Sequence, residues 1–240
     1  MPLNGLCLFL QPPTKQSGKG TIITMYNSIL FDLDGTLTDP KDGITKCVQY
    51  ALEKMGITPP PQDDLLCFIG PPLVDSFMKF CKMSADDAEL ALNFYRERFS
   101  DIGIFENSVI NGIPELLKKL KEHGYTIALA TSKPQVYAKR ILEHFDLAKY
   151  FDIEVGAELD GTRNAKKDVI AEVLRQLPDT AVPVMVGDRR QDVIGAKACA
   201  VPCIGVRFGY AEENELESAG ADMIAETVDE LYDIILKSYK

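Results

Sequence analysis

The spacing of apolar residues changes twice along the chain. Residues 28–31 form a short apolar run, which is typical of a buried β-strand. Between about residues 42 and 100, apolar positions such as Ile44, Val48 and Leu52 recur at helical spacing, which predicts amphipathic helices. From there to the C-terminus, short apolar runs alternate with helical segments. This alternation indicates βαβ units, so the sequence predicts an α/β fold, a Rossmann-like parallel sheet with helices on both faces.

The helical block interrupts the α/β pattern and is therefore interpreted as an inserted all-α cap domain. In this interpretation residues 41–103 form the cap, and residues 25–40 and 104–240 form the core domain. Residues 1–24 contain an apolar run that is too short for a signal peptide, followed by a Gly-, Ser- and Lys-containing stretch. We predict that they are a disordered N-terminal extension.

Turn and capping residues divide both predicted domains into elements. Proline-rich breaks at 59–61 and 70–72 flank a helical piece that begins at Leu65, and Ser84 is a candidate N-cap for a long helix ending at Phe99. In the core, strands are expected over 125–130, 153–155, 182–186, 202–206 and 222–225, and helices over 114–122, 134–145, 167–176, 190–199 and 228–237.

Composition narrows the classes of partner. The chain has 240 residues, 46% of them hydrophobic, and a formal net charge of −10. An acidic protein repels nucleic acid and anionic membranes, and no stretch approaches the ~20 apolar residues of a membrane span. The six scattered cysteines are expected to be reduced and packed as small apolar side chains. We therefore expect a cytoplasmic protein, a monomer or homodimer, that binds neither nucleic acid nor membranes.

Polar side chains of a particular kind follow three of the predicted strands, and one more precedes a helix. In chain order they are Asp32, Asp34, Gly35, Thr131, Lys133, Lys166, Asp188 and Asp192. A parallel sheet brings the carboxyl ends of its strands to one edge, where ligands bind. Carboxylate oxygens there suit Mg²⁺, and a hydroxyl and an ammonium suit a phosphate.

In this order and spacing, the residues resemble the four motifs of the haloacid dehalogenase-like phosphohydrolases. The motifs are Asp32-Leu-Asp34-Gly-Thr, Thr131, Lys166 and Gly187-Asp188 followed by Asp192. The resemblance extends from about residue 26 to the C-terminus. The predicted helical block lies between the first and second motifs, as in the subgroup with a small α-helical cap. The resemblance implies hydrolysis of small phosphomonoesters with Mg²⁺ as cofactor.

The resemblance also implies a role for each carboxylate. Asp32 is the expected nucleophile, which forms an aspartyl-phosphate. Asp34 is the expected acid and base; a single residue separates it from Asp32, so both side chains lie on one side of an extended chain. The expected metal ligands are Asp32, the backbone carbonyl of Asp34, and Asp188. Asp192 is expected to act behind them, on metal-bound water or on Lys166.

The phosphate-binding residues are less sharply indicated. Thr131 and Lys166 are expected to bind the phosphoryl oxygens. Lys167 is adjacent to Lys166. The resemblance favours Lys166, because it stands three residues before Val169, the first core-facing position of its helix, which is where members of the family place this lysine. Lys133 is either a second phosphate contact or a solvated loop charge, and the sequence leaves this open.

The substrate is the least determined feature. Four segments resemble the 5′-nucleotidase branch close to phosphoglycolate phosphatases: residues 35–39, 69–72, 158–163 and 205–210. Nucleoside 5′-monophosphates are therefore favoured, with phosphoglycolate next. A sugar phosphomutase and a phosphotyrosine-type phosphatase remain open, while Asp34 argues against a phosphoacceptor of the receiver type and the expected Mg²⁺ argues against a dehalogenase. The cap aromatics are expected to pack between helices rather than enclose a substrate; they are Phe77, Phe80, Phe94, Tyr95 and Phe99.

Overall fold

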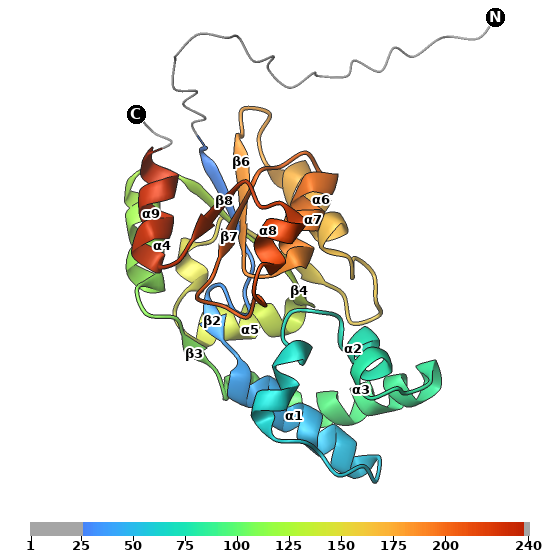
Figure 1. The fold of residues 1–240 in the computed structure, drawn as a ribbon. Helices are drawn as coiled ribbons and strands as arrows, with labels where there is room; N and C mark the ends of the chain where they lie inside the picture. Colours follow the sequence, from blue (N-terminus) through green and yellow to red (C-terminus); the bar gives the residue numbers. More distant parts are fainter. Residues whose placement is uncertain (1–25, 238–240) are drawn as a thin grey trace, which may run out of the picture.

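The computed structural model describes residues 26–237, so the predicted N-terminal extension lies outside the described residues. A six-stranded sheet forms its centre, in the order β5-β4-β1-β6-β7-β8 (Figure 1). Every pairing in this sheet is parallel. The strands are β1 (Ser28–Phe31), β4 (Thr126–Pro134), β5 (Ile153–Ala157), β6 (Pro183–Gly187), β7 (Cys203–Val206) and β8 (Met223–Ala225). The predicted α/β fold is thus confirmed.

Helices cover both faces of the sheet because the buried strands are apolar on both sides. Ile29 and Phe31 of β1 pack into one core cluster, with α4 (Ile113–Glu122), α5 (Gln135–His144) and α9 (Val228–Lys237). Leu30 of the same strand faces the opposite cluster, which contains residues of three further helices. These are α6 (Lys166–Gln176), α7 (Arg190–Ala198) and α8 (Glu215–Ala219).

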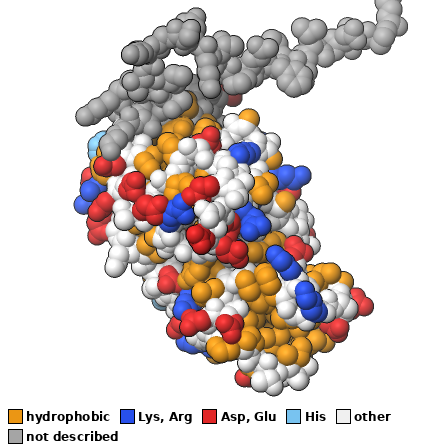
Figure 2. All heavy atoms as spheres, viewed as in Figure 1, with side chains coloured by type: hydrophobic (Ala, Val, Ile, Leu, Met, Phe, Trp, Pro, Cys, Tyr) orange, Lys and Arg blue, Asp and Glu red, His pale blue; other side chains and the backbone are white. Residues whose placement is uncertain are grey.

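A helical insertion follows β1 and lies beyond the carboxyl ends of the strands (Figure 1). It comprises α1 (Lys41–Lys54), the 3₁₀ helix η1 (Gln62–Phe68), α2 (Leu73–Phe80) and α3 (Ala85–Phe99). The predicted N-cap of α3 is present, since the Asp87 amide donates to Ser84 Oγ at 3.1 Å. Hydrophobic side chains gather over this part of the surface (Figure 2). Met78 and Phe80 of α2 are exposed.

Several short elements differ from the sequence prediction. The predicted helical piece after Leu65 is part of the 3₁₀ helix η1, confined between prolines. β4 continues four residues past its predicted end at Ala130, through an irregular register with β5. The two-residue strands β2 (Thr38–Asp39) and β3 (Ser108–Val109) pair antiparallel, and two further 3₁₀ turns occur, η2 (Gly103–Phe105) and η3 (Ala148–Tyr150). The exact limits of the cap domain stay a prediction.

No helix among the described residues is long and apolar enough to cross a membrane.

Candidate active site

Two carboxylates follow the end of β1. Asp32 and Asp34 are both buried, and Leu33 between them is fully buried on the core side. The Asp32 amide donates to the Val186 carbonyl at 2.9 Å, which fixes the first carboxylate beside β6. Gly35 then turns the chain with a φ of +80°, a conformation that glycine adopts without strain.

Three carboxylates meet at this edge of the sheet. One carboxylate oxygen from each of Asp32, Asp188 and Asp192 lies within 4.8 Å of the others, and all three side chains are buried. Asp188 follows β6 and is held in place by Thr36 Oγ1, which donates to its Oδ1 at 3.3 Å, and by the Tyr210 amide, which donates to its Oδ2 at 2.8 Å. Two segments far apart in sequence therefore orient this carboxylate.

Two glycines make room for the Asp188 carboxylate. A Cβ atom added to Gly35 would stand 2.1 Å from Asp188 Oδ2, and one added to Gly209 would stand 2.4 Å from Asp188 Cβ. Real Cβ atoms do not approach other atoms so closely, so any side chain at either position would displace the carboxylate or the loop that carries it. The glycines thus define the space in which Asp188 lies.

Lys166 connects two of the three carboxylates. Its Nζ is 2.8 Å from Asp32 Oδ1 and 2.8 Å from Asp192 Oδ1, and it donates to the Ala130 carbonyl at 3.1 Å. Burial alone would lower the pKa of this lysine, but the charges of Asp192 and Asp32 outweigh it, and the pKa lies above its usual value. Gly195 on α7 provides space for the Lys166 stem. The neighbouring Lys167 is exposed.

The carboxylate cluster has the donor set of a divalent-cation site. Burial, together with the charges of Asp192 and Asp32, raises the pKa of Asp188 well above its usual value. Oδ1 of Asp32 and of Asp192 are buried and, among the described residues, accept no hydrogen bond beyond the ion pairs with Lys166. A hard cation would satisfy these oxygens and stabilise the clustered charge, so the residues fit Mg²⁺.

Thr131 lies on β4, two residues beyond Leu129, which pairs with Phe31 of β1. It is buried, and its Oγ1 accepts a hydrogen bond from the Lys133 amide at 3.2 Å. The structure thus places Thr131 on the strand next to Asp32, at the same edge of the sheet.

Lys133 is the main residue that the sequence leaves undecided. Its Nζ lies 2.9 and 2.6 Å from the two carboxylate oxygens of Asp34, and both side chains are buried. The interpretation of Lys133 as a solvated loop charge is therefore wrong. Burial raises the pKa of Asp34 and the Lys133 ammonium opposes this rise.

A cleft of about 510 Å³ opens above Asp34 and Lys133, between the helical insertion and the core. Gly70 to Pro72 form part of its lining, as do Phe68, Tyr95 and Phe99 of the insertion and Tyr137 of the core. Tyr95 and Phe99 stack on one another with ring centroids 5.2 Å apart. Both side chains belong to the buried core, as expected for packing residues, and both also line the cleft.

Arg189, to which the sequence analysis assigned no role, ties the insertion to the core. Its guanidinium donates to the Ile69 carbonyl and, at 3.0 Å, to Glu215 Oε1. Its backbone amide donates to Asp192 Oδ2 at 3.0 Å. Gly70 provides the space, since a Cβ there would stand 2.9 Å from Arg189 Cγ. The segment from Asp188 into the first turn of α7, which includes Asp192, thus also holds the loop of the insertion that borders the cleft.

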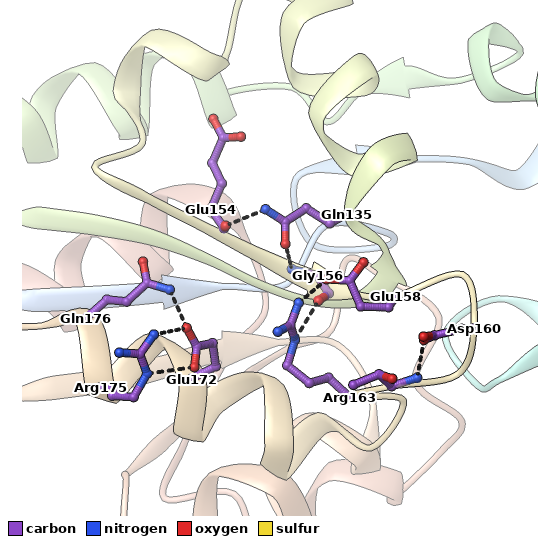
Figure 3. Close-up of polar contacts among 10 residues, drawn as sticks. Gln135, Glu154, Gly156, Glu158, Asp160, Arg163, Glu172, Arg175 and Gln176 are labelled. Carbon is purple, nitrogen blue, oxygen red and sulfur yellow. Dashed lines mark hydrogen bonds and ion pairs between the residues drawn. The ribbon is translucent and has the colours of Figure 1, made fainter.

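The loop after β5 forms the core side of the cleft mouth. Figure 3 shows Arg163 folded back onto the Gly156 carbonyl and Glu158, with Asp160 accepting a hydrogen bond from the Thr162 amide at 2.8 Å. These contacts close the loop into a compact turn. Arg96 of α3 reaches across the cleft and donates to the Leu159 carbonyl at 3.1 Å.

Comparison with known proteins is consistent with this geometry. A family model described as haloacid dehalogenase-like hydrolase matches residues 29–206. A 5′-nucleotidase of Pseudomonas aeruginosa is 47% identical over 194 residues, covering 80% of this chain and 88% of that protein. A protein of Mycobacterium tuberculosis named tyrosine-protein kinase PtkA is 39% identical over 207 residues, covering 85% of this chain and 70% of that protein.

The fold has a solved relative as well. The crystal structure of a "predicted phosphatase" from Clostridium acetobutylicum superimposes with a TM-score of 0.85 at 46% identity, covering 89% of this chain and 99% of that one. The family match spans most of the described chain, from β1 to β7, and includes every residue of the carboxylate cluster and Lys166. The chain therefore belongs to the haloacid dehalogenase-like hydrolases, as a phosphomonoester hydrolase with a helical insertion.

Proposed function

We propose that this protein hydrolyses nucleoside 5′-monophosphates to a nucleoside and inorganic phosphate, through an aspartyl-phosphate on Asp32. One observation carries the proposal: the buried cluster of Asp32, Asp188, Asp192 and Lys166 lies at the sheet edge, while Asp34 lines a cleft with aromatic walls. The carboxylate and lysine cluster supports phosphoryl transfer. The aromatic lining of the cleft supports a leaving group that contains a nucleobase.

The proposed chemistry proceeds in two steps. A carboxylate oxygen of Asp32 forms a bond to phosphorus while the bond to the nucleoside oxygen breaks, and Asp34 donates a proton to that oxygen. Asp34 then takes a proton from a water molecule, whose oxygen attacks the phosphorus of the aspartyl-phosphate. The bond between phosphorus and Asp32 breaks, and the nucleophile is restored.

The other residues are assigned to charge and position. Lys166 and Thr131 are proposed to bind the phosphoryl oxygens and stabilise the charge that builds there. Asp192 holds Lys166 in place through their 2.8 Å ion pair. We assign Lys133 to the placement of the Asp34 carboxylate.

Mg²⁺ is proposed to be held by Asp32 and Asp188, with the Asp34 carbonyl as a further ligand and Asp192 behind them. When bound, it supplies positive charge that offsets the phosphoryl oxygens and the clustered carboxylates. The partly unsatisfied carboxylate oxygens and the glycine-lined space around Asp188 support this assignment.

The cleft supports a substrate larger than a two-carbon phosphate. Small-molecule sites commonly have volumes of about 300–1,000 Å³, and the cleft of about 510 Å³ falls in this range. Tyr95, Phe99 and Tyr137 belong to the lining, and the parts of these side chains that border the cleft offer apolar contact to a nucleobase. A two-carbon leaving group would leave most of these walls uncovered.

Phosphate release from a panel of substrates tests the proposal. The panel contains the common nucleoside 5′-monophosphates, 2-phosphoglycolate, hexose phosphates and phosphotyrosine, each with Mg²⁺ and with the Asp32→Asn variant as the blank. The highest kcat/KM is expected for a nucleoside 5′-monophosphate. A clear preference for any other member would overturn the substrate assignment, and isomer formation from a hexose phosphate without phosphate release would identify a phosphomutase.

A further inference from the structure

Charged side chains line the cleft unequally. At its base, Asp34 and Lys133 form one compensated pair. The remaining charged residues of the lining are one base, Arg96, and four acids, which are Asp75, Glu89, Glu158 and Asp160. Formally, the lining above the base therefore carries three more negative than positive charges.

Both cations of the lining are already engaged. Lys133 contacts the two oxygens of Asp34, and Arg96 donates to the Leu159 carbonyl at 3.1 Å. Arg96 spans the mouth from the insertion to the core, and one of its N–H groups is used on a neutral backbone oxygen. Its positive charge remains, but it is outnumbered by the four acids of the lining, which surround any second anionic group of a substrate.

The acids fall into two kinds. Glu158 is ion-paired with Arg163, and Asp160 is hydrogen-bonded within the loop, as Figure 3 shows. The hydrogen bond from the Thr162 amide lowers the pKa of Asp160, so this carboxylate is charged at neutral pH. Asp75 on α2 and Glu89 on α3 are exposed and have no cationic partner in the described part of the chain. Their negative charge therefore acts on whatever enters the cleft.

We infer that the four acids of the lining, Asp75, Glu89, Glu158 and Asp160, select substrates by the charge of the leaving group. This acidic rim admits esters whose leaving group is uncharged or cationic, and it disfavours esters whose leaving group carries a second anion. The inference rests on the proposed phosphatase activity, because the phosphoryl end must first bind at the carboxylate and lysine cluster. An uncharged nucleoside is not repelled by the acidic rim. The carboxylate of 2-phosphoglycolate and the second phosphate of a nucleoside bisphosphate are both repelled by it.

The expected size of the effect follows from Coulomb's law. Two like charges about 6 Å apart in water disfavour binding about threefold, and more where the cleft excludes water. Ions screen the interaction, since the Debye length falls from about 10 Å at 0.1 M salt to about 3 Å at 1 M. Selection by the rim is therefore expected to weaken as salt is added.

The decisive experiment uses two substrates of nearly equal size. 2-Hydroxyethyl phosphate and 2-phosphoglycolate differ in that a neutral hydroxymethyl group replaces a carboxylate. The ratio of the kcat/KM values of the two substrates removes the contribution of the phosphoryl group, which both substrates share. A second pair, a nucleoside 5′-monophosphate and the matching 3′,5′-bisphosphate, repeats the test with the proposed substrate class.

The ratio is compared in three proteins. In the wild type the uncharged member of each pair is expected to be preferred. In the Asp75→Asn/Glu89→Gln variant the preference should fall about tenfold, and raising the salt to about 0.5 M should reduce it in the wild type. The Glu53→Gln/Asp86→Asn variant removes two exposed acids of the insertion that do not line the cleft, and it should retain the wild-type ratio.

Failures of the two proposals are distinguishable. If the charged member of either pair is turned over as well as its uncharged partner, or if the rim variant keeps the wild-type ratio, the charge selection is wrong even where nucleotides are hydrolysed. If nucleotides are poor substrates but the small pair shows the expected ratios, the nucleotide assignment falls and the charge selection stands. If no member of either pair is hydrolysed, both proposals are overturned.

Discussion

Lys133 places its ammonium against both carboxylate oxygens of Asp34, at 2.9 and 2.6 Å, in a buried site. The same ammonium lies 4.9 Å from the centre of the Phe99 ring, on the last turn of α3. Lys133 comes from the core and Phe99 from the helical insertion, so one cation joins the proposed acid and base to the wall of the cleft. A cation over an aromatic face is attracted by the ring, more strongly where water is excluded.

Replacing Lys133 by methionine is expected to destabilise the protein by about 3 kcal/mol, because it leaves the Asp34 carboxylate buried without its cation. Turnover should fall as well, since the carboxylate loses the group that places it. Urea unfolding measures the first effect and phosphate release the second. The exposed Lys167→Met is the matched control and should shift stability by less than about 0.5 kcal/mol.

A double variant separates the lost pair from lost packing. If the cost of Lys133→Met arises from the unpaired carboxylate, adding Asp34→Asn should recover part of the lost stability, because no buried charge remains. A double variant whose losses simply add would contradict a direct interaction between the two side chains.

Asp32→Asn is expected to reduce phosphate release by roughly four orders of magnitude or more, since an amide oxygen is a poor nucleophile and no aspartyl-phosphate can form. Folding should be retained, because the amide has the size of the carboxylate and relieves negative charge beside Asp188 and Asp192. Circular dichroism and thermal unfolding check the fold. Turnover near the wild-type rate in a correctly folded variant would contradict the nucleophile assignment.

Local patterns were sufficient to predict most of the fold and the three carboxylates. Runs of apolar residues predicted β1 and β6, and Asp32 and Asp188 directly follow them. Because parallel strands place their carboxyl ends at the same end of the sheet, the two carboxylates were expected to lie close together. The position of the motif lysine relative to Val169, as the family resemblance implies it, favoured Lys166, which contacts the cluster, over the exposed Lys167. These features depend on residues close in sequence or on a general rule of sheet topology.

Features that depend on contacts between distant segments could not be predicted in this way. The burial of Lys133 requires Asp34, 99 positions away, and the Phe99 ring of the insertion. Arg189 is fixed by Glu215 on α8, a helix of five residues that is too short to produce a recognisable periodicity. A charged residue in a loop is exposed by default, so only the three-dimensional partners reveal that it is buried.

Gly209→Ala is expected to weaken activation by Mg²⁺ at least about tenfold, because the new Cβ would stand 2.4 Å from Asp188 Cβ and 2.3 Å from the Gly35 carbonyl oxygen. Titrations of activity and of the Mg²⁺-induced rise in Tm both measure the effect. Gly56→Ala is the control: its φ of +74° costs about 1 kcal/mol of stability, but open space surrounds it, so its Mg²⁺ dependence should match the wild type. Equal Mg²⁺ dependence in both variants would contradict the proposed site.

Stability is expected to decrease between about pH 9 and 11 through the buried thiol of Cys47. Burial raises its pKa to about 11 despite a contact of 3.2 Å with Arg98 Nη1. The unfolded state therefore loses the thiol proton at lower pH than the folded state, so the free energy of unfolding decreases as pH rises through this range, by about 2–3 kcal/mol in total.

Urea unfolding of Cys47→Ala from pH 7 to 11 should show a shallower decrease. Val48→Ala, which truncates a neighbouring buried side chain without an ionisable group, should be less stable throughout but keep the wild-type slope. Equal slopes for Cys47→Ala and the wild type would show that this thiol does not control the alkaline limit.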